Sequence, residues 1–522
     1  METLRSYVGG RWAEGEGPLD TLVNPATEEP LARLGNEGID RGAALDYARR
    51  TGGPVLRALT FAERGELLSA MCDRIQAHRD EILDLAVANG GNTRSDAKFD
   101  VDGATFTLSA YAELGKSLGA ARLLADGEGV TLGRSPRFHG QHIAVPRQGV
   151  AIHVNAFNFP AWGLAEKAAV AILAGVPVVA KPATSSSLVA HRIMEILVDR
   201  KVLPEGVLSL LVGGAGDLLR HVGPQDVVAF TGSGDTGALI RALPEVIRDS
   251  VRVNVEADSL NAAVLGPDVE PGSETYELFL KDVVRDMTQK AGQKCTAIRR
   301  VLAPEGLADR VRDDLIDRLS TITVGNPAHD GVRMGPVATA AQRDDVTIGI
   351  EALARDGRLV FGRTAAPVGV PGGKGFFVGP VLIEVEPGAD APTVHSREVF
   401  GPVATVVPFP GDAPSAARIV ARGRGGLVSS IYSEDAAFTT EAALGLAPYH
   451  GRLFLGSAKI AEQSPGPGTV LPSLVHGGPG RAGGGEELGG LRGLAFYMQR
   501  VALEGSRPVI ERIAGLKGAP SS

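Results

Sequence analysis

The sequence predicts an α/β protein with a doubly wound parallel sheet, a second α/β domain and an extended β arm. Three observations support this fold class. Short apolar stretches alternate with helical segments between residues 149 and 232, and a second alternating series begins after residue 261. Residues 127–149 instead form extended segments with polar faces. Buried strands that alternate with helices form parallel sheets, whereas an extended polar segment needs another sheet or subunit to cover its edges.

The N-terminal quarter is expected to contain first strands and then helices. Residues 7–35 combine aromatic and β-branched residues with Gly and Pro, which is typical of short strands and turns. Residues 38–125 are predicted to be mainly helical, because apolar residues recur at helical spacing, as in Phe61 to Cys72. Cys72 lies inside this pattern and is expected to be a small core residue.

The first alternating series predicts four strands, at residues 149–154, 176–180, 207–212 and 227–232. Helices are expected at residues 164–173 and 187–199, with a third beginning at residue 217. The cluster from Thr184 to Ser187 can cap the second of these helices. Such an arrangement is typical of nucleotide-binding domains, although a fold alone does not establish a function.

The second series begins with a strand at residues 261–265 and a long helix at residues 274–288. We expect further strands at residues 298–303, 376–386, 403–409 and 427–432, and a helix at residues 307–322. Residues 461–491 are rich in Gly and Pro, and we interpret them as an ordered loop near the site. A strand at Leu494–Met498 is then expected in a tail that pairs with another subunit.

Composition excludes several classes of function. The 522 residues predict roughly two to four domains, and the formal charge of −8 gives no general attraction to nucleic acid or anionic membranes. The longest apolar run, residues 168–180, is too short to span a bilayer, and the N-terminus lacks the apolar core of a signal peptide. Two cysteines form neither a disulfide framework nor a metal-ligand pattern. We therefore expect a soluble, cytoplasmic protein without a metal.

Cys295 is the candidate nucleophile. A lone cysteine is more often a buried structural residue, but Gly292, Gln293, Lys294 and Thr296 are small or polar and follow a long helix. A thiol in such a segment can be exposed, and the charge of Lys294 can favour the thiolate. On the spacing alone, the structural and the catalytic interpretations have equal weight.

Glu256 is the candidate general base. It lies in the apolar segment Val253 to Ala257, where strand periodicity places it on one face with Asn254 and Asp258. A solvated loop carboxylate is the simpler interpretation without Cys295. A partly buried glutamate can have a raised pKa, which suits a general base near neutral pH.

Polar residues follow three of the predicted strands. Asn158 follows the first strand and can donate an amide hydrogen to an oxyanion, although Asn at a strand end is usually part of a turn. Lys181 follows the second strand, where ligands bind in doubly wound sheets, although it can also be a surface lysine. The turn from Phe230 to Gly237 can hold phosphate on its backbone amides, but Gly-rich turns of this kind are common.

Taken together, the order and spacing of these motifs resemble the NAD(P)-dependent aldehyde dehydrogenase superfamily over almost the whole chain. The matching segments include Lys181-Pro182-Ala183-Thr184, Phe230-Thr231-Gly232-Ser233, Gly292-Gln293-Lys294-Cys295-Thr296 and Glu398-Val399-Phe400-Gly401-Pro402. Within this superfamily, Asn155 to Gly163, Val255 to Asn261 and His476 to Arg492 resemble a branch of enzymes that act on semialdehydes in aerobic aromatic-acid degradation. That branch includes 3,4-dehydroadipyl-CoA semialdehyde dehydrogenases and the aldehyde dehydrogenase module of a bifunctional phenylacetate ring-cleavage protein.

The resemblance implies a domain organisation and a set of roles. Residues 1–126 and 150–257 are expected to form a Rossmann-like cofactor domain, residues 258–475 the catalytic domain, and residues 127–149 and 491–522 an oligomerisation arm and tail. Cys295 is implied to attack the aldehyde, Asn158 and the Cys295 backbone amide to stabilise the oxyanion, and Glu256 to activate water. The implied cofactor residues are Lys181, Thr184, Ser185, Phe230, Thr231, Gly232, Ser233, Glu398 and Phe400.

The resemblance also supports expectations for the cofactor and the substrate. NAD-preferring relatives have an acidic residue three positions after the lysine, whereas this chain has Thr184, so we expect NADP. The expected reaction is oxidation of a CoA-linked semialdehyde, such as 3,4-dehydroadipyl-CoA semialdehyde, to the acid in benzoate or phenylacetate degradation. The alternatives are a CoA-acylating or broad-specificity aldehyde dehydrogenase, and a non-catalytic structural protein on the same scaffold. The arm predicts a homodimer or a dimer of dimers.

Overall fold

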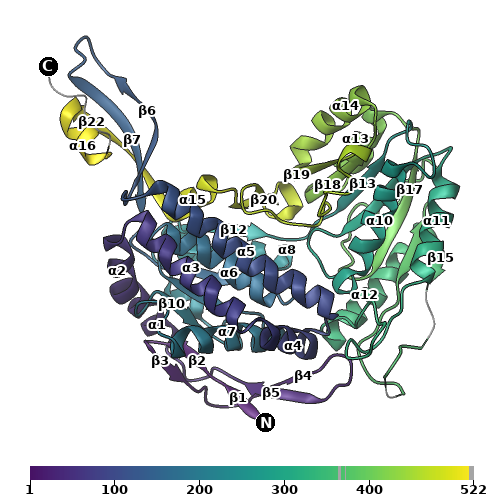
Figure 1. Cartoon of the computed structure of the whole chain (residues 1–522), viewed down its shortest axis with the longest axis horizontal. Helices are drawn as coiled ribbons and strands as arrows, with labels where there is room; N and C mark the ends of the chain where they lie inside the picture. The colour runs from purple at the N-terminus through teal and green to yellow at the C-terminus, as the bar shows by residue number, and fades with distance from the viewer. Residues whose placement is uncertain (363–365, 371, 516–522) are drawn as a thin grey trace.

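The computed structural model describes residues 1–362, 366–370 and 372–515, and it confirms the α/β class with two large sheets (Figure 1). The first sheet has seven strands in the order β12-β11-β8-β9-β10-β2-β3. The first five of these are parallel, whereas β2 and β3 are antiparallel to their neighbours. The strands are β2 (Ser6–Val8), β3 (Arg11–Ala13), β8 (Ala151–Val154), β9 (Val178–Lys181), β10 (Leu208–Leu210), β11 (Val227–Thr231) and β12 (Arg252–Glu256).

Helices cover both faces of the first sheet, so its central strands are buried on each side. Val178 and Ala180 pack against a helical layer on one face, while Val179 between them packs on the other. The first layer contains α3 (Phe61–Ala77), α4 (Arg79–Gly90), α5 (Arg94–Leu118), α6 (Pro160–Leu173) and α7 (Ser187–Asp199). The opposite face carries α1 (Arg41–Tyr47), α8 (Gly234–Arg241) and α9 (Pro244–Arg248).

The second sheet also has seven strands, in the order β15-β16-β17-β14-β13-β18-β19, and only the edge strand β15 is antiparallel. Its strands are β13 (Asn261–Leu265), β14 (Ile298–Pro304), β15 (Arg358–Gly362), β16 (Val381–Glu384), β17 (Val403–Phe409), β18 (Gly426–Tyr432) and β19 (His450–Gly456). One face packs on α10 (Glu274–Thr288) and α11 (Ala308–Ser320). The other packs on α12 (Ala340–Leu353), α13 (Ala413–Ala421) and α14 (Ala436–Leu446).

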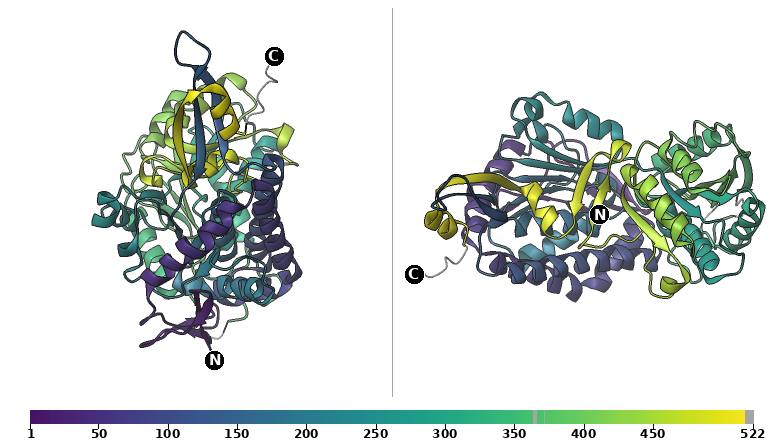
Figure 2. Two further views of the ribbon diagram at one scale, coloured as in Figure 1. Left: turned by 90° about the vertical axis from the view of Figure 1, so that its left-hand side faces the viewer. Right: turned by 90° about the horizontal axis from the view of Figure 1, so that it is seen from above.

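A long β arm projects away from both sheets (Figures 1 and 2). It consists of β6 (Leu124–Thr131), β7 (Phe138–Pro146) and β22 (Met498–Ser506), paired antiparallel in the order β22-β7-β6. The short helix α16 (Arg507–Ile513) follows β22. The extended segment predicted at residues 127–149 is therefore confirmed as part of a sheet. Residues 516–522 of the predicted tail lie outside the described residues.

The remaining elements are small. A three-stranded sheet near the N-terminus contains β1 (Glu2–Leu4), β4 (Asp20–Val23) and β5 (Pro30–Leu34). Helix α2 (Gly53–Ala58) follows α1 after a π-helical turn. A hairpin of β20 (Val475–Gly478) and β21 (Gly485–Leu488) lies inside the Gly-rich segment 461–491. No helix in the described parts of the chain is long and apolar enough to cross a membrane.

Three local predictions were wrong. Leu494–Met498 is not a strand, because α15 (Leu491–Tyr497) buries Leu494 and Tyr497 at helical spacing and the strand begins only at Met498. The cluster at Thr184 forms a 3-10 turn, and the Ser187 hydroxyl donates to the Ala183 carbonyl instead of capping α7. The segment after Asp217 is a 3-10 turn, Leu218–His221, rather than the start of an α-helix.

Candidate active site

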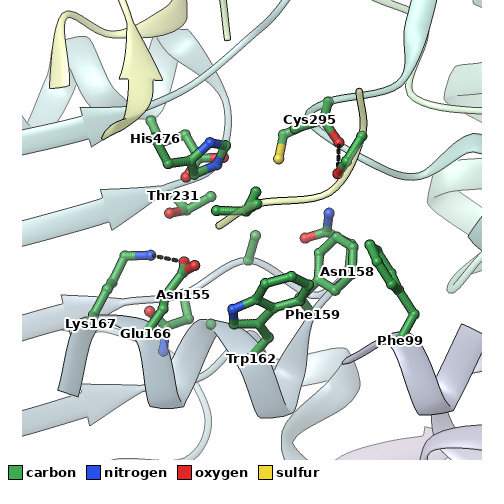
Figure 3. A pocket seen from close by; sticks show the side chains of 16 residues that line it. Phe99, Asn155, Asn158, Phe159, Trp162, Glu166, Lys167, Thr231, Cys295 and His476 are labelled. Atoms are coloured by element: carbon green, nitrogen blue, oxygen red, sulfur yellow. Dashed lines mark hydrogen bonds and ion pairs between the residues drawn. The ribbon is translucent and has the colours of Figure 1, made fainter. Parts of the chain in front are cut away.

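A cavity between the two sheets brings together side chains from distant parts of the chain (Figure 3). We call it the inner cavity. Cys295 lies on the loop that joins α10 to β14, and Asn158 lies between β8 and α6. Glu256 is the last residue of β12, and His476 comes from β20. The Cys295 thiol, a Glu256 carboxylate oxygen and a His476 ring nitrogen lie within 4.8 Å of one another.

The backbone before Cys295 has an unusual conformation. Lys290, Ala291 and Gly292 all have positive φ, at 54°, 53° and 70°. Left-handed backbone costs roughly 1–2 kcal/mol at each residue that carries a Cβ. Gly292 avoids this cost, and a Cβ at its position would overlap the Gly401 carbonyl. The chain turns sharply after α10 and presents Cys295 to the cavity.

Two buried polar side chains hold this loop from behind. Arg299 donates from Nη2 to the carbonyls of Gly292 at 3.0 Å and Lys294 at 3.1 Å. Asn261 donates from Nδ2 to the carbonyls of Cys295 at 2.8 Å and Ala297 at 2.9 Å. These four bonds satisfy buried carbonyls on both sides of Cys295, so they fix the position of the thiol.

Lys294 does not favour a thiolate at Cys295, in contrast to the prediction. It is buried, and its Nζ donates to Asp286 Oδ1 at 2.7 Å and Gln289 Oε1 at 2.9 Å. Burial and the carboxylate of Glu256 raise the pKa of the Cys295 thiol well above its ordinary value. Cys295 is partly exposed to the cavity and is protonated at neutral pH in this arrangement.

Glu256 is buried, but its pKa moves in the direction opposite to the prediction. Burial alone would raise the pKa, but the positive charges of His476 and Lys167 outweigh it and lower the pKa of Glu256 to about 2. His476 Nε2 lies 3.3 Å from Glu256 Oε1. Burial disfavours the charged form of His476 and so lowers its pKa, but the negative charge of Glu256 outweighs burial and raises the pKa of His476. The two groups therefore form a buried ion pair.

A second group of buried charges lies behind Glu256. Carboxylate oxygens of Glu166, Glu256 and Glu487 lie within 4.8 Å of one another. Lys167 Nζ is 3.0 Å from Glu166 and 3.2 Å from Glu487, and its side chain is 2% exposed. Burial lowers the pKa of Lys167, but Glu487 and Glu166 reverse the effect and raise it, so the lysine stays charged.

Asn158 is placed to bind the oxygen of a carbonyl group. Its side chain lines the inner cavity beside Cys295, and its Nδ2 donates to the Gln293 carbonyl at 3.0 Å. The amide nitrogen carries a second hydrogen that is available to a ligand. The sequence analysis predicted that Cys295, Glu256 and Asn158 lie in one site, and in the structure all three line the inner cavity.

A groove opens on the other side of Cys295, and we call it the nucleotide groove. It has a volume of about 630 Å³ and shares Asn158, Thr231, Glu256 and Cys295 with the inner cavity. Four predicted cofactor residues line it with Thr231: Gly232, Ser233, Glu398 and Phe400. Burial raises the pKa of Glu398 to about 7, although Arg299 opposes this effect from 3.6 Å.

The other predicted cofactor residues lie beside this groove rather than in its lining. Lys181 ends β9, and Thr184 and Ser185 lie in the 3-10 turn that follows. Between Lys181 and this turn, Ala183 is the residue that lines the groove. Phe230 is 5% exposed and belongs to the hydrophobic core beneath the groove. Its side chain is therefore packed against protein, and only its backbone is near the Gly232 turn.

The groove fits a dinucleotide. Within the described part of the chain, the Thr231 hydroxyl and Glu398 Oε1 are buried without a hydrogen-bond partner, so both atoms can bond to hydroxyls of a ligand. Lys181 is 9% exposed, and among the described residues its Nζ makes no hydrogen bond or ion pair. Burial lowers the pKa of this lysine, and an anionic group of a ligand would compensate for the missing partner.

Sequence reasoning missed several residues of the site. Lys167 gave a usable signal, because it and the adjacent Glu166 are the two charged residues of a helix, α6, that otherwise lacks charge. His476 and Glu487 gave none, because they stand in a Gly-rich segment where no periodicity distinguishes a buried polar residue from a solvated one. Arg299 stands in the predicted strand at residues 298–303, beside a second arginine, and the pattern does not show which of the two faces the site.

Comparisons with known proteins identify the fold. Residues 12–502 match the model of the aldehyde dehydrogenase family. The chain is 48% identical to 3,4-dehydroadipyl-CoA semialdehyde dehydrogenase of Aromatoleum evansii, over 91% of this chain and 93% of the relative. It is 27% identical to a non-phosphorylating aspartate-semialdehyde dehydrogenase of Halomonas elongata, over 95% and 94% of the two chains.

Solved structures of aldehyde dehydrogenases share the fold of this chain. A betaine aldehyde dehydrogenase of Staphylococcus aureus in complex with NAD+ superposes with a TM-score of 0.83, at 23% identity and with 96% and 97% of the two chains covered. A lactaldehyde dehydrogenase from Escherichia coli has a TM-score of 0.81, at 25% identity with 96% and 99% covered. This chain belongs to the aldehyde dehydrogenase family, whose members are oxidoreductases that act on aldehydes with a nicotinamide cofactor.

Proposed function

We propose that this enzyme oxidises a CoA-linked semialdehyde, such as 3,4-dehydroadipyl-CoA semialdehyde, to the acid with NADP. The observation that carries the proposal is the 48% identity, over nearly the full length, to a relative whose name gives that substrate. The pathway is aerobic degradation of benzoate or phenylacetate. The convergence of Cys295, Glu256 and Asn158 supports the chemistry.

The first step is addition of the Cys295 sulfur to the aldehyde carbon. The thiol proton passes to Glu256 as the C–S bond forms, because the Glu256 carboxylate hydrogen-bonds to Cys295 and is ionised in the presence of His476 and Lys167. The carbonyl oxygen, which becomes an oxyanion, accepts a hydrogen bond from Asn158 Nδ2. The result is a thiohemiacetal on Cys295.

The second step releases the acid. Thr231, Ser233 and Glu398 would hold a nicotinamide dinucleotide in the nucleotide groove, and it would supply the oxidant for loss of hydride from the former aldehyde carbon. Cys295 is then left as a thioester. Glu256 gives up the thiol proton to solvent and then removes a proton from water as the water oxygen attacks the thioester carbon. It returns this second proton to the Cys295 sulfur as the C–S bond breaks. The acid leaves and the thiol re-forms. A base buried beside the nucleophile favours this hydrolysis over transfer of the acyl group to another thiol.

NADP is supported by the charge around Lys181. The turn after β9 contains Thr184, Ser185 and Ser186, and no carboxylate. A 2′-phosphate placed here would meet a lysine without an anionic partner and hydroxyls that donate hydrogen bonds. An acidic residue at position 184 would instead repel the phosphate.

A homodimer or dimer of dimers is supported by the arm. The arm and α16 expose Val130, Leu132, Phe138, Val501 and Val509, which are 41% to 55% exposed. Apolar residues gathered on a projecting sheet are typical of a surface covered by a second copy.

We expect replacement of His476 by glutamine to move the acidic limb of the kcat/KM pH profile upward by about one unit or more. Glutamine keeps a hydrogen bond to Glu256 but removes the positive charge, so burial raises the pKa of Glu256 and the base is lost at a higher pH. His450→Gln is the matched control, because His450 is a buried histidine on β19 with partners outside the site. An acidic limb that stays in place would contradict the ion-pair role.

The substrate is tested with a panel of CoA-linked and free semialdehydes, followed by the absorbance of reduced nicotinamide. The CoA-linked compounds are expected to give kcat/KM at least about tenfold higher, a difference of about 1.4 kcal/mol. Product must form without added CoA. A requirement for free CoA would indicate the acylating reaction, and equal rates across the panel would indicate a broad-specificity enzyme.

Cofactor preference is tested by measuring kcat/KM with NADP and NAD for the wild type and for Thr184→Glu. The wild type is expected to prefer NADP, and the new carboxylate to lower that preference at least about tenfold. Thr184→Ser, which keeps the hydroxyl, should change it little. A wild type that prefers NAD would refute the proposal.

Oligomeric state is tested by sedimentation equilibrium. The wild type is expected as a dimer or tetramer, and Val501→Glu combined with Val509→Glu as a smaller species, because charge at a covered apolar surface is costly. Leu444→Glu, on α14 and 71% exposed, is the control that should leave the assembly intact. A monomeric wild type would rule out the assembly.

A further inference from the structure

Two further hollows lie beyond the inner cavity, and neither shares a lining residue with the nucleotide groove. A second hollow, which we call the passage, shares Phe99 and Gly468 with the inner cavity. A third, the outer hollow, shares Arg285 and Gln289 with the passage and has a volume of about 700 Å³. The shared residues place the three hollows next to one another, in the order from Cys295 to the outer hollow.

Two glycines, Gly466 and Gly468, lie close to the cations that line the passage. A Cβ at Gly466 would overlap the Arg285 guanidinium, and a Cβ at Gly468 would lie 2.7 Å from Lys294 Nζ. Any larger residue at either position would displace these cations, which line the passage itself. Glycine at both positions therefore leaves these two cations in place in the wall of the passage.

The outer hollow is basic, although the whole chain has a formal charge of −8. Its lining contains Arg94, Lys281, Arg285, Arg318 and Arg333, against the carboxylates Asp96 and Asp330. Three of the arginines already pair with nearby carboxylates: Arg94 with Asp80 and Asp84, Arg285 with Asp282, and Arg318 with Glu277.

Lys281 and Arg333 are the two cations of the outer hollow that remain unpaired. Both are exposed, and neither side chain makes a hydrogen bond or ion pair within residues 1–362, 366–370 and 372–515. They project from different segments, α10 and the stretch before α12, into the same hollow. Two free cations that face one space are suited to a multiply charged anion.

The chemistry along the three hollows changes in a defined order. The inner cavity is bordered by Phe99, Phe159, Trp162 and Val470, which suit an acyl chain. The passage offers Gln289, Asp286 and Thr469, which suit a thin arm that carries amides. The outer hollow supplies the unpaired cations. A coenzyme A thioester has the same order: acyl chain, amide-containing pantetheine arm, and a phosphorylated nucleotide.

We propose that the outer hollow binds the phosphates of the coenzyme A part of the substrate, with Lys281 and Arg333 as their principal contacts and the pantetheine arm in the passage. This inference rests on the proposed function, since it assumes a CoA-linked substrate. The oxidised cofactor then reaches Cys295 from the nucleotide groove, and the substrate reaches it from the opposite side.

The test is the double variant Lys281→Glu, Arg333→Glu, assayed with a CoA-linked semialdehyde and with the free semialdehyde of the same chain. The KM for the CoA-linked substrate is expected to rise about tenfold or more, with kcat nearly unchanged. Kinetics with the free semialdehyde should stay as in the wild type, which also shows that the variant is folded. In the wild type, the KM for the CoA-linked substrate should rise with ionic strength, whereas the KM for the free semialdehyde should not.

The control is Arg11→Glu, a charge reversal at an exposed residue of β3, at the other end of the molecule from α10 (Figure 1). A wild type that prefers the CoA-linked substrate, with a double variant whose KM is unchanged, would overturn the outer hollow as the binding site while leaving the proposed function intact. A wild type that does not distinguish the two substrates would overturn the proposed function, and this inference with it.

Discussion

The burial of the Glu256 carboxylate is the constraint on which the rest of the site depends. An ionised carboxylate taken out of water costs several kcal/mol unless a positive group compensates it. His476 and Lys167 supply that charge from β20 and α6, two elements more than 300 residues apart in the chain. Because the buried carboxylate must stay charged, the hairpin and the helix must both be held against the end of β12.

Because His476 must stay beside Glu256, the β20–β21 hairpin that carries it is bonded to the end of β12. Asn254, on β12, donates to Glu487 at 2.9 Å and accepts from the Glu486 backbone at 2.9 Å. The Ala257 backbone donates to the Ala482 carbonyl at 3.1 Å. Polar side chains thus tie a Gly-rich segment to the sheet, which is why a composition typical of disorder forms an ordered wall of the cavity.

The sequence predicted the parts of this site that depend on local pattern. Strands followed by helices placed Asn158 after a parallel strand, and strand periodicity placed Glu256 on one face with Asn254 and Asp258. In the structure both residues lie where parallel strands of one sheet end. It failed where the outcome depends on distant partners. The direction of the Glu256 pKa is set by His476, and Lys294 is removed from the thiol by Asp286. Neither partner is visible in the local sequence.

The segment at residues 491–498 shows a different kind of failure. Leu494 to Met498 are apolar and aromatic, so their intrinsic preference is for a strand. Packing overrides that preference, because Leu494 and Tyr497 both reach the core next to α6 only if the chain is helical there. The strand then begins at Met498, the residue at which the chain leaves the core and pairs with β7.

The two-sided access to Cys295 follows from where its loop lies. Arg299 and Asn261 hold that loop at the end of the second sheet, while Glu256 and Asn158 belong to the first. The thiol therefore stands at the junction of two sheets, with one opening on each side of the junction. A dinucleotide and an aldehyde that enter from opposite sides meet only at this atom. The walls of each opening can then vary without disturbing the other, which allows one fold to keep its chemistry while its aldehyde changes.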